Sequence, residues 1–104
     1  MSTKETTRDL TDAELEKVAG QFRLLGESMR LKILQSLCAG PLAVGEIVAA
    51  TGATQSNISK HLSLLASAGV ITRHKDGQFV YYGMRNQLTM KLRELVHKEL
   101  LNQP

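Results

Sequence analysis

Apolar residues recur three or four positions apart in the first part of the chain, a spacing that places them on one face of an α-helix. Thr11 and Glu14 have the pattern of a capping box and predict that the helix begins there. Gly26 is predicted to end it, because glycine tolerates a positive φ. The apolar face of this helix consists of Leu15, Val18, Ala19, Phe22 and Leu25.

Two further helices are predicted to follow. Ser28 is the expected N-cap of the first, whose apolar residues are Leu31, Ile33, Leu34 and Leu37. The Ala-Gly-Pro sequence at positions 39–41 is a strong stop signal. The apolar stretch Leu42–Ala50 predicts a short helix of about two turns that closes at Thr51-Gly52.

The pattern then changes from helix to strand. Thr54 is the expected cap of a fourth helix, Gln55 to about Ser67, whose apolar face is Ile58, Leu62 and Leu65. Residues 70–75 and 78–84 are rich in β-branched and aromatic residues. Asp76-Gly77 lies between them, which predicts a tight β-hairpin.

Apolar residues from Leu88 to Leu100 predict a last helix. The order is therefore four helices, a two-stranded hairpin and a helix, which is a mainly α fold. We expect one domain over residues 11–104, preceded by a flexible tail over residues 1–10, where no apolar periodicity is found.

Composition limits the class of protein. The longest apolar runs are far shorter than the ~20 residues that span a bilayer, so we expect no membrane-embedded segment. The polar N-terminal residues are unlike a secretory signal peptide. A single cysteine cannot form an internal disulfide framework, which favours a reducing compartment. We therefore expect a cytoplasmic protein.

The charge is unevenly distributed. Residues 1–50 have six Lys or Arg and seven Asp or Glu, a net charge of −1, whereas residues 51–104 have seven and three, a net charge of +4. A basic half favours a polyanionic partner, because Lys and Arg displace the counterions condensed on phosphates. A basic surface that is merely solvated is the alternative at this modest charge.

The third and fourth predicted helices, joined at Gly52-Ala53, have the pattern of a helix-turn-helix. The N-terminal half of the second of them is polar and carries side chains that suit base edges and phosphates in a major groove. The alternative is that these residues only cap the helix or face solvent, and for His61 a structural role is the alternative to a phosphate contact. The candidate DNA contacts of this helix are Thr54, Gln55, Ser56, Asn57, Ser59, Lys60 and His61.

The hairpin tip adds a second candidate contact. It is basic apart from Asp76, and a basic hairpin after a helix-turn-helix is typical of a wing that approaches the DNA backbone or the minor groove. An ordinary solvated turn is the alternative. The candidate wing contacts are Arg73, His74, Lys75 and Gln78.

Several segments in this order resemble the ArsR/SmtB family of bacterial repressors. They are Leu24–Leu34, Val44–Ile47, Gln55–Leu65, Gly69–Ile71 and Val80–Tyr82. The resemblance covers about residues 15–100. It implies a winged helix-turn-helix fold and a repressor that binds double-stranded DNA and releases it in response to a signal. Residues 26–29, Gly-Glu-Ser-Met, depart from the Ala-Asp-Pro-Thr more usual in the family.

The resemblance also implies a homodimer. A domain of this size cannot cover the apolar faces of its first and last helices, and in the family these helices pair with a second copy. Two-fold symmetry then implies an inverted-repeat operator. The candidate dimer contacts are Leu15, Val18, Phe22, Leu88, Leu92, Leu95 and Val96.

The family's metal sites have no counterpart at the matching positions. Its cysteine pair falls on Ala43 and Gly45, and its last-helix site falls on residues 86, 88, 99 and 102, of which only Glu99 could ligate. We therefore predict no metal and no cofactor. Cys38 is either a buried, inert residue or a thiol that an oxidant modifies. The effector, a small molecule or a redox agent, is not identified.

Two other function classes are less consistent with the sequence. The chain has no glycine-rich phosphate loop, no nucleophile elbow and no His-Glu-x-x-His pattern, so no enzyme is predicted. A winged helix that binds only proteins is the alternative function. It would expose an apolar or mixed-charge groove rather than polar and basic side chains, and its complexes would be insensitive to salt.

Overall fold

The computed structural model describes residues 9–103. The predicted tail over residues 1–10 therefore lies outside the described residues, except for Asp9 and Leu10, which are exposed and precede the first helix. The elements are α2 (Asp12–Leu25), α3 (Ser28–Ser36), β1 (Leu42–Ala43), α4 (Val44–Thr51), α5 (Gln55–Ser67), β2 (Ile71–Asp76), β3 (Phe79–Met84) and α6 (Leu88–Leu101).

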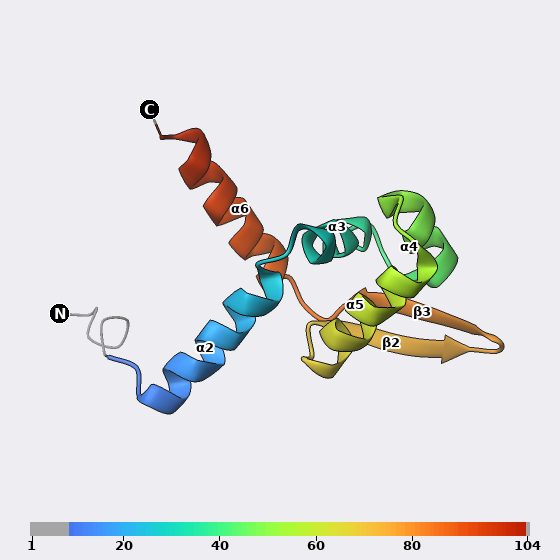
Figure 1. The fold of residues 1–104 in the computed structure, drawn as a ribbon, viewed down its shortest axis with the longest axis horizontal. Coiled ribbons are helices and arrows are strands. Elements are labelled where there is room, and N and C mark those ends of the chain that lie inside the picture. Colours follow the sequence, from blue (N-terminus) through green and yellow to red (C-terminus); the bar gives the residue numbers. More distant parts are fainter. Residues whose placement is uncertain (1–8, 104) are drawn as a thin grey trace.

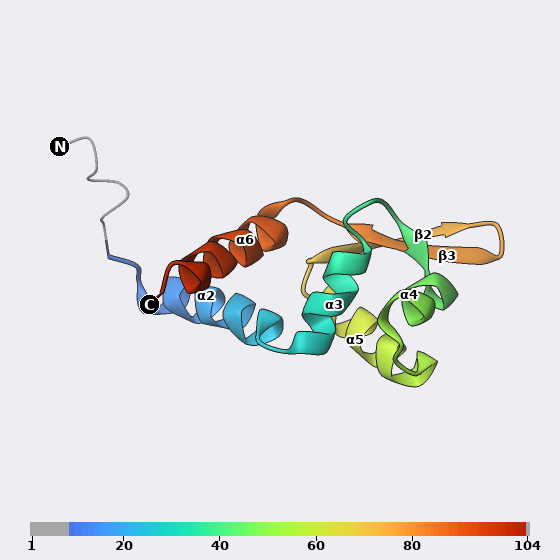
Figure 2. The ribbon, with the colours of Figure 1, turned by 90° about the horizontal axis from the view of Figure 1, so that it is seen from above.

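The molecule has two differently built ends. Helices α3, α4 and α5 gather beside the sheet at one end, while α2 and α6 diverge from α3 at the other (Figure 1). The hairpin of β2 and β3 projects beyond α4 and α5 (Figure 2). The shape is accordingly elongated, with extents of 54 × 35 × 21 Å. This arrangement is a winged helix-turn-helix, as predicted.

The core lies at the end that holds α3, α4 and α5. Its fully buried members include Ile33, Ile47 and Leu62, one from each of these helices. The predicted apolar face of α5, which also holds Ile58 and Leu65, is buried completely. Each such side chain contributes roughly 1.5–3 kcal/mol on burial, which is enough to hold three short helices together.

The sheet has three strands rather than the two that were predicted. Its order is β1-β3-β2, all antiparallel, with Leu42 opposite Tyr82 and Ala43 opposite Tyr81. The prediction that a helix begins at Leu42 was therefore wrong. These two residues instead pair with the free edge of β3, and α4 begins at Val44, where the Ala43 N–H donates to Glu46 Oε1 at 2.9 Å.

The hairpin turn lies one residue later than predicted. Asp76 pairs with Phe79, so the two-residue loop is Gly77-Gln78 and not Asp76-Gly77. Gly77 has a φ of +64°, whereas no non-glycine residue among those described has a positive φ. A positive φ at the first loop position alone is the pattern of a type II′ turn, which requires glycine there.

Helix ends were predicted with mixed success. The capping box of α2 is confirmed, because Thr11 Oγ1 accepts from the Glu14 N–H and Glu14 Oε1 accepts from the Thr11 N–H. Gly26, however, has a φ of −82°, so a left-handed residue does not end α2. Its N–H donates to the Arg23 carbonyl in a tight last turn. Ser28 was also wrongly predicted as a cap, since it is the first residue of α3.

Gly52 ends α4 in the turn that precedes α5. It has a φ of +76°, and an added Cβ would meet no atom within 4 Å, so replacement by alanine changes only the backbone energy. We expect Gly52→Ala to lower the free energy of unfolding by about 1–2 kcal/mol. Gly45→Ala is the matched control, because Gly45 also has open space but a normal helical φ. Urea denaturation should show Gly45→Ala to be neutral or stabilising, and equal losses in both variants would contradict this account.

Candidate nucleic-acid interface

The helix-turn-helix is held by local bonds in the turn. The Gly52 N–H donates to the Val48 carbonyl at 2.8 Å, and this closes α4. Thr54 then caps α5, with its Oγ1 accepting from the Asn57 N–H at 3.3 Å. The N-terminus of α5 is therefore well defined, and its positive dipole end and remaining free N–H groups face solvent, where a phosphate could bind.

The polar half of α5 is free to contact a ligand. The buried edge, formed by Ile58, Leu62 and Leu65, turns the opposite edge outward. None of the outward side chains has a hydrogen-bond or ion-pair partner among the described residues. They are Gln55, Ser56, Asn57, Ser59 and Lys60, all exposed. Thr54 is exposed as well, although its oxygen already serves the cap.

His61 differs from the other candidates on α5. Its side chain is only 11% exposed. Its Nδ1 accepts a hydrogen bond from Arg30 Nε at 3.2 Å, and its Nε2 lies 4.0 Å from Glu27 Oε1. The ring is thus held inside the protein, and we do not retain His61 among the proposed DNA contacts.

The two strands of the wing divide its candidates between two faces. Residues directly opposite in an antiparallel pair share a face, and successive residues alternate between faces. Arg73 and Lys75 lie on the same face as the buried Ile71, whereas His74 lies on the other face, opposite Tyr81. All three candidates and Gln78 are exposed.

Sequence reasoning missed an aromatic pair on the wing. Phe79 is 54% exposed, and its ring centroid lies 6.5 Å from that of Tyr81. Both side chains share the face of His74. The alternation of residues along β3 could have placed them together, since they are two positions apart in a strand.

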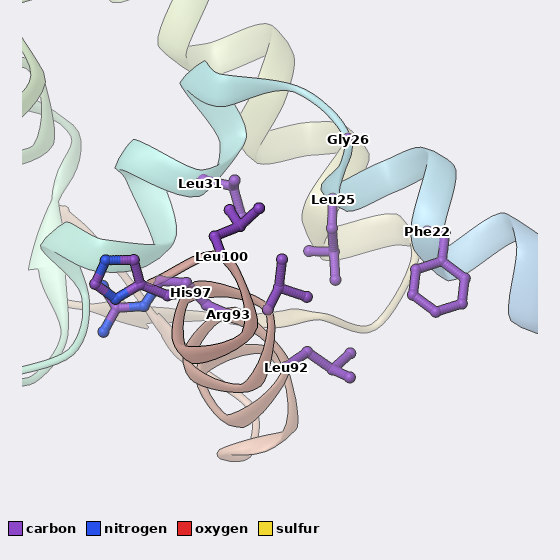
Figure 3. Close-up of a pocket in the computed structure, with 9 residues that line it drawn as sticks. Phe22, Leu25, Gly26, Leu31, Leu92, Arg93, His97 and Leu100 are labelled. Carbon is purple, nitrogen blue, oxygen red and sulfur yellow. The ribbon is translucent and has the colours of Figure 1, made fainter. Parts of the chain in front are cut away.

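The predicted dimer residues lie at the other end of the molecule. Most are exposed although apolar, with Phe22 at 59% and Leu95 at 64%. Where α2 and α6 diverge, they border an open apolar cavity of about 370 Å³ (Figure 3). Leu92, which is half-buried, lies in its wall. The other members, all exposed, are Leu15, Val18, Leu88 and Val96.

Cys38 lies in the turn that follows α3. The residue is exposed, so the alternative of a buried thiol is wrong. Its Sγ lies 3.9 Å from the Leu34 carbonyl oxygen. Its suggested redox role stays a prediction.

Residues 9–103 also bear on metal binding and on membrane insertion. No group of three or more His, Cys, Asp or Glu side chains is placed to hold a metal ion in this part of the chain. None of its helices combines the length and the apolar character needed to cross a membrane.

Residues 27–73 match the family described as bacterial regulatory protein, arsR family. The cadmium resistance transcriptional regulatory protein CadC of Listeria innocua is 36% identical over 87 residues, which cover 83% of this chain and 73% of CadC. The chain belongs to the ArsR family. As a family member it is a winged helix-turn-helix, DNA-binding transcription regulator, as predicted, and its family is not one of enzymes.

Solved structures align with most of the chain. NolR from Sinorhizobium fredii aligns with a TM-score of 0.77 and 29% identity, covering 88% of this chain and 95% of NolR. A homodimeric winged helix-turn-helix DNA-binding domain from Mycobacterium bovis, described as a possible ArsR-family transcriptional regulator, aligns with a TM-score of 0.74 and 30% identity. This second alignment covers 90% of each of the two chains. The alignments thus extend well beyond the helix-turn-helix.

The basic side chains of the interface should contribute without regard to DNA sequence. We expect Lys60→Ala or Lys75→Ala to weaken binding to every duplex and to reduce the slope of log affinity against log salt by about one unit for each phosphate that is no longer neutralised. Fluorescence anisotropy over a salt series measures this slope. Lys91→Ala on α6 is the control and should leave it unchanged, and an equal reduction there would contradict the placement of the interface.

Gln55 should act differently because its amide can pair with a base edge. We expect Gln55→Ala to relax the preference at one operator position by about 1–3 kcal/mol while the salt slope stays constant. Competition between duplexes that carry each base at each position measures this preference. If all positions keep their original preference, Gln55 does not contact a base.

Proposed function

We propose that this ArsR-family protein is a homodimeric repressor that binds an inverted-repeat operator and releases it when a signal arrives. The observation that carries the proposal is the polar edge of α5. Its five exposed side chains have no partners among the described residues, and the first strand of the basic wing, β2, contacts the same helix. In this proposal the protein acts in the cytoplasm, because the DNA to which it binds lies in that compartment.

The N-terminal half of α5 enters the major groove in this proposal. Gln55 suits an adenine edge, since its amide both donates and accepts. Ser56, Asn57 and Ser59 supply shorter groups that donate and accept, and Lys60 contacts phosphate. The free N–H groups at the start of α5 support this orientation, because they favour the approach of phosphate along the helix axis.

The wing contacts the neighbouring backbone or minor groove. Arg73 and Lys75 share one face of the hairpin, so both cations can approach the same run of phosphates. His74 and Gln78 lie at the opposite face and at the tip. We infer that these positions follow the minor-groove wall, where the negative potential favours basic side chains.

The divergent helices α2 and α6 form the dimer interface. Their exposed apolar side chains border a cavity that a single chain leaves open, and two-fold pairing covers both faces at once. The homodimeric state of the Mycobacterium bovis relative supports this assignment. Pairing places two copies of α5 roughly 34–36 Å apart, one turn of DNA, which requires an inverted repeat.

Repression follows from occupancy of the operator, and induction requires a signal that lowers the affinity for it. A small molecule or a redox agent remains the proposed effector class, with the exposed Cys38 as the redox candidate. A Cys38→Ser variant that still responds to oxidants would remove this candidate.

Selection of genomic fragments tests the proposed function. The purified protein is incubated with sheared genomic DNA at about 100 mM salt, where ionic screening is moderate. Bound fragments are then sequenced and footprinted. We expect an inverted repeat with half-sites one turn apart and a steep loss of affinity with salt. Absence of enrichment, together with a salt-insensitive protein complex, would instead favour a winged helix that binds only proteins.

A charge inside the apolar interface should separate the copies. We expect Leu95→Glu to convert the dimer to monomer and to lower the affinity for a full operator at least tenfold, because the two half-sites no longer bind together. Sedimentation velocity and anisotropy measure the two effects. Leu95→Met is the volume-matched control and should behave as the unaltered protein. A dimeric Leu95→Glu protein would show that the copies pair elsewhere.

A further inference from the structure

A polar cluster connects three helices at the centre of the molecule. It consists of Glu27, which is the N-cap of α3, Arg30 of α3 and His61 of α5, and Arg30 also bonds to the end of α2. The side chains of Arg30 and His61 are 15% and 11% exposed. Because polar groups are costly to bury without partners, the bonds of this cluster indicate a constrained geometry.

Arg30 uses a different nitrogen for each of its three contacts. Its Nη1 donates to the Leu24 carbonyl in the last turn of α2 at 3.1 Å, and its Nε donates to His61 Nδ1 at 3.2 Å. Its Nη2 lies 3.7 Å from Glu27 Oε2. The guanidinium is rigid and planar, so the positions of these acceptors are linked. A shift of one helix changes the geometry of the bonds to the others.

His61 connects this cluster to the edge of α5 that faces outward. Among residues 9–103, the core packing of α5 uses the buried side chains Ile58, Leu62 and Leu65 and the partly buried Ala66. These apolar contacts determine which edge of the helix is buried, but they are not directional. The Arg30–His61 bond is directional, and His61 directly follows Lys60 in the chain. The bond therefore restrains rotation close to the proposed DNA contacts.

We propose that Arg30 and His61 are positioning residues that couple the orientation of α2 to that of α5. This inference rests on the proposed function, in which α2 pairs with the second copy and α5 contacts DNA. A displacement of α2 moves the Leu24 carbonyl, and the guanidinium transmits the displacement to the His61 ring. The coupling requires a neutral ring with its proton on Nε2, because Nδ1 must accept from Arg30.

Two variants of nearly equal shape test the coupling. Asparagine has an oxygen close to the position of Nδ1, whereas leucine has a methyl group there. We expect His61→Leu to lower the ratio of operator to random-duplex affinity about tenfold, as the loss of one hydrogen bond to a charged group predicts. We expect His61→Asn to keep that ratio within about threefold. Random-duplex affinity should be unchanged in both, since His61 is not among the proposed DNA contacts.

A second measurement reports on α2 in the absence of DNA. The Leu25 N–H shares a peptide group with the Leu24 carbonyl, so its NMR resonance senses the Arg30 bond. We expect this resonance to move in His61→Leu and to stay in place in His61→Asn. Arg30→Lys, which keeps the charge but loses the fork, should move it as well. Thermal unfolding identifies any variant whose changes come from loss of the fold.

The outcomes are distinct. An unmoved Leu25 resonance in His61→Leu, or discrimination within twofold of the unaltered protein, would overturn the coupling. Equal losses in His61→Asn and His61→Leu would do so too, because the accepting atom would then be irrelevant. Failure of the unaltered protein to bind any duplex would contradict the proposed function itself, and this is visible before any variant is compared.

Discussion

The orientation of α5 depends on the burial of one edge of that helix. Ile58, Leu62 and Leu65 are fully shielded from solvent, packed among the buried residues of α3 and α4. Three such side chains contribute roughly 1.5–3 kcal/mol each, a sum comparable to the net stability of a small domain. Because that edge is inside, the polar edge must be outside, and the candidate DNA contacts follow from the packing.

The limited number of apolar residues also explains why one end of the molecule has a buried core and the other end does not. The core uses α3, α4, α5 and the base of the hairpin, and α2 contributes only Leu24 to the buried core of the described residues. The outer faces of α2 and α6 keep large apolar side chains in solvent. Exposed apolar surface of this kind marks an interaction site. The protein therefore has a buried core at one end. In our proposal, a second copy covers the apolar faces of α2 and α6 at the other.

Arg30 stands between these two ends. It satisfies a carbonyl at the end of α2, which has no partner within its own helix, and it fixes a side chain of α5 at the same time. A winged helix could be held together by apolar contacts alone. A directional contact at this junction makes the angle between the two ends definite, and that angle determines how two recognition helices would meet one duplex.

Local signals in the sequence were sufficient for several elements. The Thr11 capping box, the Thr54 cap and the apolar spacing of α5 depend on residues at most a few positions apart, so a single sequence contains all the information that they require. The two-residue turn was found but displaced by one position, because Asp-Gly and Gly-Gln are both acceptable turn sequences. Strand pairing over the whole hairpin decided between them.

Other features needed the tertiary structure. Leu42 and Ala43 resemble the start of a helix, and only the free edge of β3, about 40 residues later in the chain, makes them a strand. The sequence placed His61 among polar neighbours, whereas the fold turned its ring toward Arg30, 31 positions earlier. Sequence alone determined the helices, the polar edge of α5 and the basic wing, since periodicity and local hydrogen bonding specify them. Tertiary packing decided which polar side chains remain free, because burial depends on residues distant in the chain.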